Sequence, residues 1–126
     1  MVLPARAVIS WEGDSLDVLK EWPPIIQRAF GTALWRLQEG ERPAIPSRSM
    51  QSIGSGVFEL KAADDATWYR IVYLTRIEDT IYVLDSFTKK TRKTEKNDLN
   101  RARARLAQVK QRLQEERTHA KHKRNQ

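Results

Sequence analysis

Three consecutive stretches with the side-chain alternation of β-strands restrict this chain to few folds. They cover residues 57–63, 68–77 and 81–88, separated by segments of four and three residues. Neighbouring side chains of a strand point to opposite faces of its sheet, and connections this short join antiparallel partners. The second half of the chain is therefore predicted to contain a three-stranded antiparallel meander.

Helical patterns lie before the meander. Residues 5–11 predict a first strand, and a short helix over residues 16–21 must end before the proline pair at 23–24. A second helix can begin at these prolines, since apolar residues recur every three or four positions over residues 26–37. Residues 41–56, rich in proline, glycine and serine, are predicted to form a loop.

A third helix is predicted after the meander, from about Thr94 to Glu116. Apolar residues recur along it every three or four positions, at Leu99, Ala102, Leu106, Val109 and Leu113. The resulting order, β-α-α-β-β-β-α, predicts an α+β domain over residues 1–117, with an antiparallel sheet and helices packed on one face. Residues 118–126 are basic and lack apolar anchors, so we expect a disordered tail.

The composition of the chain indicates the cellular compartment in which the protein is expected. Its 126 residues include no cysteine, which excludes disulfides and thiolate metal sites. No apolar run approaches the roughly 18 residues that span a bilayer, and the N-terminal residues do not resemble a signal peptide. We therefore expect a cytoplasmic protein that makes no membrane contact.

Positive charge is concentrated towards the C-terminus. The formal net charge is +7 and the sequence pI is near 10.0. Residues 1–85 carry 9 Lys/Arg and 12 Asp/Glu, whereas residues 86–126 carry 14 and 4. This asymmetry favours a polyanionic partner such as nucleic acid, although a solvated basic helix would have the same composition.

Four residues of the first two meander strands share the face opposite the apolar one: Glu59, Lys61, Trp68 and Arg70. Helices suit the apolar face, so this second face is expected to be open. Lys61 and Arg70 would be like charges on neighbouring strands, which costs stability unless an anion binds between them. A solvated cluster, in which Glu59 pairs with one of the cations, is the structural alternative.

A basic run follows the last strand and contains Lys89, Lys90, Arg92 and Lys93. Such a run binds phosphates with little sequence preference, or it forms a solvated connector. Because the last strand neighbours the strand of Arg70 in the meander, the two cationic clusters are predicted to converge.

Several segments resemble one protein family. SIGSGVFELK at 52–61, WYRIVY at 68–73 and IYVLDSFTKKTRKT at 81–94 resemble the phage-related branch of the RelE/HigB toxins, in the RelE/ParE superfamily. The resemblance extends over most of the chain in one order. It implies a RelE-like fold and the toxin of a type II toxin–antitoxin pair, an endoribonuclease that cuts mRNA on the ribosome.

The resemblance also implies a site and partners. Basic residues of the family that match Lys61, Arg70, and Lys89 or Lys90 line the cleavage site. The ribose 2′-hydroxyl is the nucleophile in such enzymes, so no metal and no other cofactor are expected. The expected partners are mRNA on the ribosome and a helix-turn-helix, HigA-like antitoxin.

From this resemblance we assign roles as hypotheses. Arg70 and Lys61 hold the scissile phosphate, Lys89 and Lys90 grip the RNA, and Glu59 is the candidate general base. The remaining RNA-binding candidates are Arg92, Lys93, Trp68 and Arg48.

Asp85 departs from the pattern, because members of this branch often have a histidine near the end of the last strand. The two histidines here, His119 and His122, lie in the C-terminal segment. Asp85 could be an alternative base, an ion-pair partner of Arg70, or a sign of weakened activity.

Two rival functions are compatible with the same fold. A ParE-like toxin would bind gyrase without cleaving RNA, but such proteins generally lack the basic set present here. A non-catalytic basic phage protein that binds RNA or the ribosome is the other rival, and Asp85 is the feature that favours it.

Overall fold

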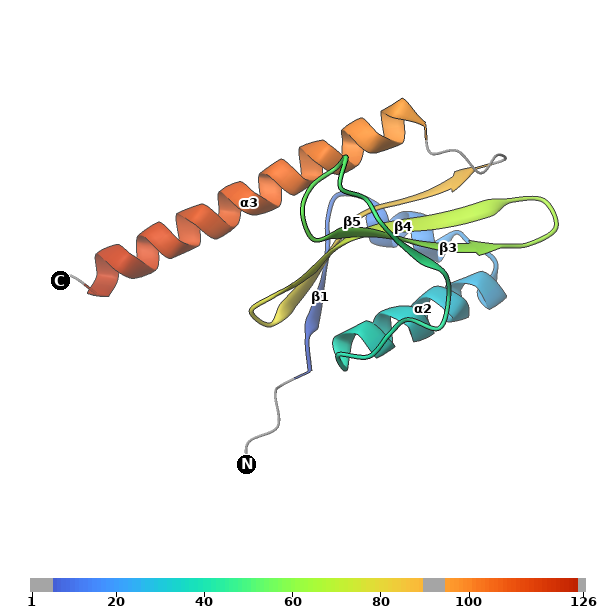
Figure 1. The fold of residues 1–126 in the computed structure, drawn as a ribbon, viewed down its shortest axis with the longest axis horizontal. Coiled ribbons are helices and arrows are strands. Elements are labelled where there is room, and N and C mark those ends of the chain that lie inside the picture. The colour runs from blue at the N-terminus through green and yellow to red at the C-terminus, as the bar shows by residue number, and fades with distance from the viewer. Residues whose placement is uncertain (1–5, 90–94, 125–126) are drawn as a thin grey trace.

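The structure is a computed structural model that describes residues 6–89 and 95–124. Its elements follow in the order β1 (Val8–Trp11), α1 (Ser15–Lys20), α2 (Pro24–Gln38), β2 (Ser47–Ser49), β3 (Val57–Ala63), β4 (Trp68–Ile77), β5 (Thr80–Lys89) and α3 (Lys96–Arg124). Figure 1 shows α3 lying along one side of a twisted sheet and α2 lying on the other side.

The sheet has five strands in the order β1-β5-β4-β3-β2. The predicted meander is confirmed, since β3, β4 and β5 pair antiparallel in sequence. β1 joins β5 in parallel, and β2 adds a short antiparallel edge strand to β3. β2 was not predicted, and its residues were assigned to a loop. The reason is that Ser47–Ser49 is a three-residue strand whose residues are all exposed and which has no apolar side chain.

The α+β class is confirmed. The helices, however, lie on both faces of the sheet and not on one face as predicted. α1 and α2 pack on the face that carries Leu60, Ile71 and Tyr73. α3 packs on the opposite face, against Val72 and Leu84 among others. The physical reason is that β4 and β5 have apolar side chains on both faces, so each face needs a cover.

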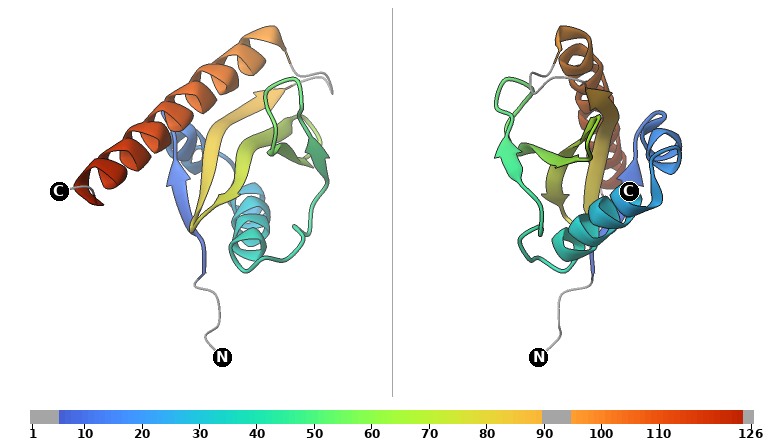
Figure 2. Two further views of the ribbon diagram at one scale, coloured as in Figure 1. Left: turned by 60° about the vertical axis from the view of Figure 1, so that its left-hand side comes forward. Right: turned by 90° about the vertical axis from the view of Figure 1, so that its right-hand side faces the viewer.

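The segment before β3 completes the cover on the α3 side. Met50 and Ile53 are buried in the same cluster as the apolar side chains of α3. Gly54 lies so close to Leu106 that a Cβ at this glycine would be 2.6 Å from the leucine Cδ2 atom. Figure 2 shows this segment passing from the outer edge of the sheet towards α3.

α3 extends further than the sequence predicts. It continues to Arg124, past the expected end near Glu116, because the intervening residues include no proline or glycine to stop a helix. Residues 114–122 are all exposed. The division into a domain at 1–117 and a disordered tail at 118–126 stays a prediction. Within the described residues, no helix combines the length and apolarity needed to cross a membrane.

Leu106 tests the apolar seam between α3 and the sheet. Leu106→Ala should lower the free energy of unfolding by about 2–5 kcal/mol, because a buried leucine leaves a cavity when truncated. Urea unfolding followed by circular dichroism measures this change. Gln114→Ala, on the exposed part of the same helix, is the control and should change stability by less than about 0.5 kcal/mol.

Removal of residues 118–126 tests the role of the protruding end of α3. The described side chains of this segment are exposed, so the shortened chain should unfold at the same urea concentration as the full chain. A loss of more than about 1 kcal/mol would show that this end stabilises the domain.

Candidate active site

A buried ion pair lies at the centre of the candidate site. Nη1 of Arg70 donates a hydrogen bond of 2.9 Å to Oε1 of Glu59. The side chains of Arg70 and Glu59 are 1% and 0% exposed. On the neighbouring edge strand β2, the exposed Arg48 places Nη2 at 3.6 Å from the same carboxylate oxygen. One carboxylate therefore joins a buried cation to a surface cation.

Lys61 and Arg70 are direct cross-strand neighbours, as the sequence predicts. The expectation that their face is open is wrong for Arg70 and Glu59, which are buried, and holds in part for Lys61, which is half-buried. The ion pair explains this burial, since a charge can leave water only when a partner compensates for its lost hydration.

Lys89 and Trp68 extend the cluster by one row, because they are cross-strand neighbours on β5 and β4. Lys89 is buried, and its Nζ contacts a carboxylate oxygen of Asp98 and lies 3.3 Å from Oε2 of Glu95. The ammonium group also lies 5.8 Å from the ring centre of Phe87. In this structure, Lys89 is therefore bound by Asp98 in the first turn of α3 and by Glu95 just before the helix.

The structure thus brings five predicted residues to one end of the sheet, on the face covered by α3: Glu59, Lys61, Trp68, Arg70 and Lys89. Arg48 joins them through Glu59. The other predicted cations, Lys90, Arg92 and Lys93, lie outside the described residues.

A hollow opens beside Lys89, with a volume of about 550 Å³. It is lined by Thr67, Thr88, Lys89, Glu95, Asn97, Asp98 and Arg101. Two cations and two carboxylates line the same space, so a phosphate entering it must compete with Asp98 for Lys89 and Arg101.

Asp85 is a buried ion-pair centre. Its Oδ2 accepts a hydrogen bond of 2.9 Å from Nε of Arg101, and its Oδ1 accepts one of 2.9 Å from Nη1 of Arg105. Burial raises the pKa of the Asp85 carboxyl, and the hydrogen bond from Arg101 acts in the opposite direction. The hydrogen bond to Asp85 in turn raises the pKa of Arg101. Of the three alternatives for Asp85, ion pairing is present, but with α3 instead of Arg70.

Arg101, Arg105 and Asp98 are the interacting residues that sequence reasoning missed. Arg101 also donates a hydrogen bond to Asp98, and Arg105 donates a hydrogen bond of 2.7 Å to Asp14 in the turn after β1. The sequence did contain a signal for this network. Arg101 and Arg105 are four positions apart and therefore on one side of the helix, and Asp85 is an acidic residue within an otherwise apolar strand.

Gly13 gives Arg105 the room that this network needs. The glycine has φ +53°, and a Cβ there would lie 2.5 Å from Cζ of Arg105. The described residues contain no group of three or more histidine, cysteine, aspartate or glutamate side chains that could hold a metal ion. His119 and His122 are exposed on the far part of α3.

The fold and the site define a small α+β protein with paired cations and carboxylates at one end of its sheet. Residues 17–107 match the family described as Phage derived protein Gp49-like (DUF891). The chain therefore belongs to the phage-derived Gp49-like family, which is related to RelE/HigB-type toxins. No curated protein and no solved structure matches the chain significantly.

Asp85→Ala tests the ion-pair centre. It should lower the free energy of unfolding by about 3–5 kcal/mol, because Arg101 and Arg105 lose their shared buried partner. Asp85→Asn should cost less than Asp85→Ala, since the amide oxygen can still accept a hydrogen bond from one of the two guanidinium groups. Urea unfolding is the measurement, with the exposed Asp65→Ala as the control. Equal losses for Asp85→Ala and Asp65→Ala would contradict this role.

Proposed function

We propose that this protein is the toxin of a type II toxin–antitoxin pair, an endoribonuclease that cuts ribosome-bound mRNA without a metal ion. The observation that carries the proposal is the cross-strand position of Lys61 beside Arg70, with Glu59 bonded to Arg70. Membership of a family related to RelE/HigB-type toxins supports it.

The proposed reaction needs a base, a cationic contact for the phosphate and a proton donor. The ribose 2′-oxygen attacks the adjacent phosphorus, the bond to the 5′-oxygen breaks, and the departing 5′-oxygen takes up a proton from solvent water, which leaves a 2′,3′-cyclic phosphate and a 5′-hydroxyl. Glu59 is the proposed acceptor of the 2′-proton, a role that requires its buried carboxylate to become accessible when RNA displaces the exposed Arg48. Lys61 is half-buried and is the proposed first contact of the scissile phosphate.

Arg70 has a more restricted role in this proposal than its position in the sequence suggests. Its side chain is buried, its cross-strand neighbours are Lys61 on β3 and Phe87 on β5, and its guanidinium is bound to Glu59. Through its hydrogen bond, Arg70 orients the carboxylate of Glu59. Direct contact with the phosphate requires the guanidinium to turn outward and release Glu59.

Lys89 and Trp68 are the proposed RNA-binding residues at the end of the sheet. An incoming phosphate replaces Asp98 and Glu95 as the partner of Lys89, and the half-buried Trp68 offers a surface on which a base can stack. Lys90, Arg92 and Lys93 follow directly in the chain and add positive charge.

Partners and location are part of the same proposal. We expect the toxin to act in the cytoplasm on mRNA held by the ribosome, and to be neutralised by a helix-turn-helix, HigA-like antitoxin. The basic run that begins at Lys89 supplies the positive charge that would attract the RNA.

A second candidate function is a non-catalytic protein that binds RNA or the ribosome. It is favoured by the internal partners that neutralise the cations of the site: Glu59 binds Arg70, and Asp98 binds Lys89. A gyrase-binding, ParE-like toxin has no such observation in its favour.

Lys61→Ala is the sharpest test, because Arg70→Ala would leave Glu59 buried without this partner and destabilise the fold. Loss of one cationic contact to the developing phosphate charge should slow mRNA cleavage about 100-fold. Cleavage is measured by mapping mRNA ends in a cell-free translation reaction. Lys110→Ala, which removes one exposed positive charge from α3, is the matched control and should cleave normally.

The outcomes separate the candidate functions. Equal cleavage by Lys61→Ala and wild type would contradict the assignment of Lys61. Wild-type protein that sediments with ribosomes but leaves the mRNA whole would favour the non-catalytic candidate. Trapped gyrase–DNA breaks with intact mRNA would favour the ParE-like function.

A further inference from the structure

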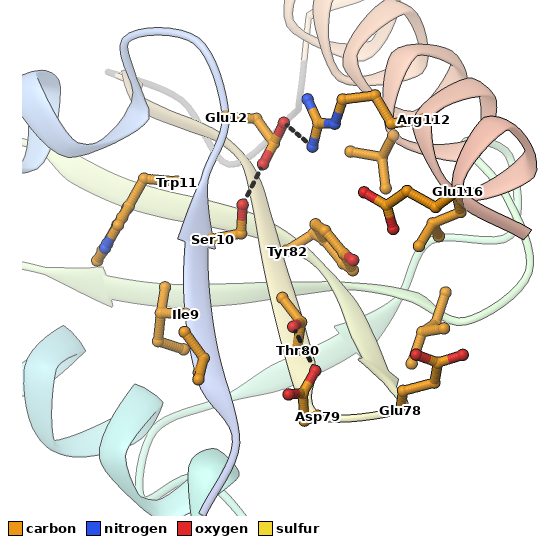
Figure 3. A pocket seen from close by; sticks show the side chains of 14 residues that line it. Ile9, Ser10, Trp11, Glu12, Glu78, Asp79, Thr80, Tyr82, Arg112 and Glu116 are labelled. Carbon is orange, nitrogen blue, oxygen red and sulfur yellow. Dashed lines mark hydrogen bonds and ion pairs between the residues drawn. The ribbon is translucent and has the colours of Figure 1, made fainter. Parts of the chain in front are cut away.

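A groove of about 600 Å³ lies at the opposite end of the sheet from the candidate active site. It runs between β1 and the second half of α3, and the turn between β4 and β5 closes one end (Figure 3). About seven residues of β4 separate this turn from Arg70, or roughly 23 Å at the usual rise of a strand. The groove is therefore a separate surface.

The main chain of β1 forms one wall of the groove. All four residues of β1 line it, yet Figure 3 shows the Ile9 and Trp11 side chains pointing away from it, towards α2. β1 is one of the two edge strands of the sheet, and among the described strands β5 is its one neighbour. An edge strand offers main-chain N–H and C=O groups on its outer side to another extended segment.

The opposite wall combines apolar and acidic side chains of α3. Val109, which is fully buried, and the half-buried Leu113 line the groove, and the exposed Glu116 lies about one turn further along α3. At the floor, Tyr82 lies below Glu116. Burial and then the negative charge of Glu116 raise the pKa of the Tyr82 hydroxyl.

The rim of the groove is negative although the whole chain is positive. Its lining includes Glu12, Glu78, Asp79 and Glu116, with Arg112 as the one lining cation. Arg112 is already bound, since its Nη2 lies 2.7 Å from Oε1 of Glu12. Glu78, Asp79 and Glu116 are exposed. This surface repels RNA and attracts a basic segment.

We propose that the groove binds a basic, extended segment of a partner protein, which lies along β1 as an added strand. Lysine or arginine side chains of the segment meet Glu78, Asp79 and Glu116. The aliphatic stems of these basic side chains pack against Leu113, while the alternate aliphatic side chains lie on the other face of the added strand, beside the partly buried Ile9 and Trp11. β1 spans roughly 13 Å, which matches four to five extended residues of the partner. Occupation of the groove leaves the candidate active site uncovered, and the inference does not depend on the proposed RNA cleavage.

A labelled synthetic peptide tests the proposal directly. The probe is a seven-residue peptide that alternates lysine with valine, and the matched peptide has glutamate in place of each lysine. Fluorescence anisotropy with the full chain should show saturable binding of the lysine peptide and none of the glutamate peptide. Equal binding of both peptides, or of neither, would overturn the proposal.

Variants of the chain then locate the bound peptide. Glu78→Gln combined with Glu116→Gln should weaken binding about three- to tenfold, as expected for two exposed ion pairs. Thr80→Lys, which puts a cation into the groove, should weaken it further. The matched control is Glu115→Gln, one position away and outside the groove lining, which should bind as the wild type does.

Two further outcomes would overturn the inference. If Glu115→Gln weakens binding as much as the double variant, the peptide recognises general negative charge on α3. If sedimentation shows a dimer that Thr80→Lys dissociates, a second copy of this chain occupies the groove in place of a basic partner segment.

Discussion

The attachment of α3 across the sheet is the constraint on which the rest of the structure depends. Ala102, Leu106 and Val109 are buried against the sheet, and they cover a face that would otherwise expose Val72 and Leu84. Burial of this apolar surface supplies most of the stabilisation, at about 25 cal/mol per Å². Ion pairs determine where α3 lies along β5, because they bind the helix at defined positions of this strand.

These ion pairs form one continuous chain of charges. Asp14 binds Arg105, Arg105 binds Asp85, and Asp85 binds Arg101. The chain continues through Asp98 to Lys89. It therefore connects the turn after β1 with the end of β5 that carries the candidate active site. Each buried member has an opposite charge beside it, which is the condition for keeping such groups out of water.

The sequence predicts the meander and the residues that face each other on its neighbouring strands, because strand alternation and short turns are local properties. The adjacency of Lys61 and Arg70 follows directly from them. It could not predict that α3 covers the second face, since a helix with one apolar stripe fits either side of a sheet. The burial of Arg70 and Lys89 was missed for the same reason: it follows from α3 covering this face, and the ion pairs with Glu59 and Asp98 compensate for the lost hydration.

Gly13 has a consequence for how this family can vary. Its missing side chain leaves the space in which the guanidinium of Arg105 reaches both Asp14 and Asp85. A methyl group at position 13 and an arginine at position 105 cannot both keep these places. The two positions are 92 apart in sequence, yet we expect a larger residue at position 13 to displace the Arg105 guanidinium from Asp14 and Asp85. Joint variation at 13 and 105 among relatives would then mark the place where α3 meets the turn after β1.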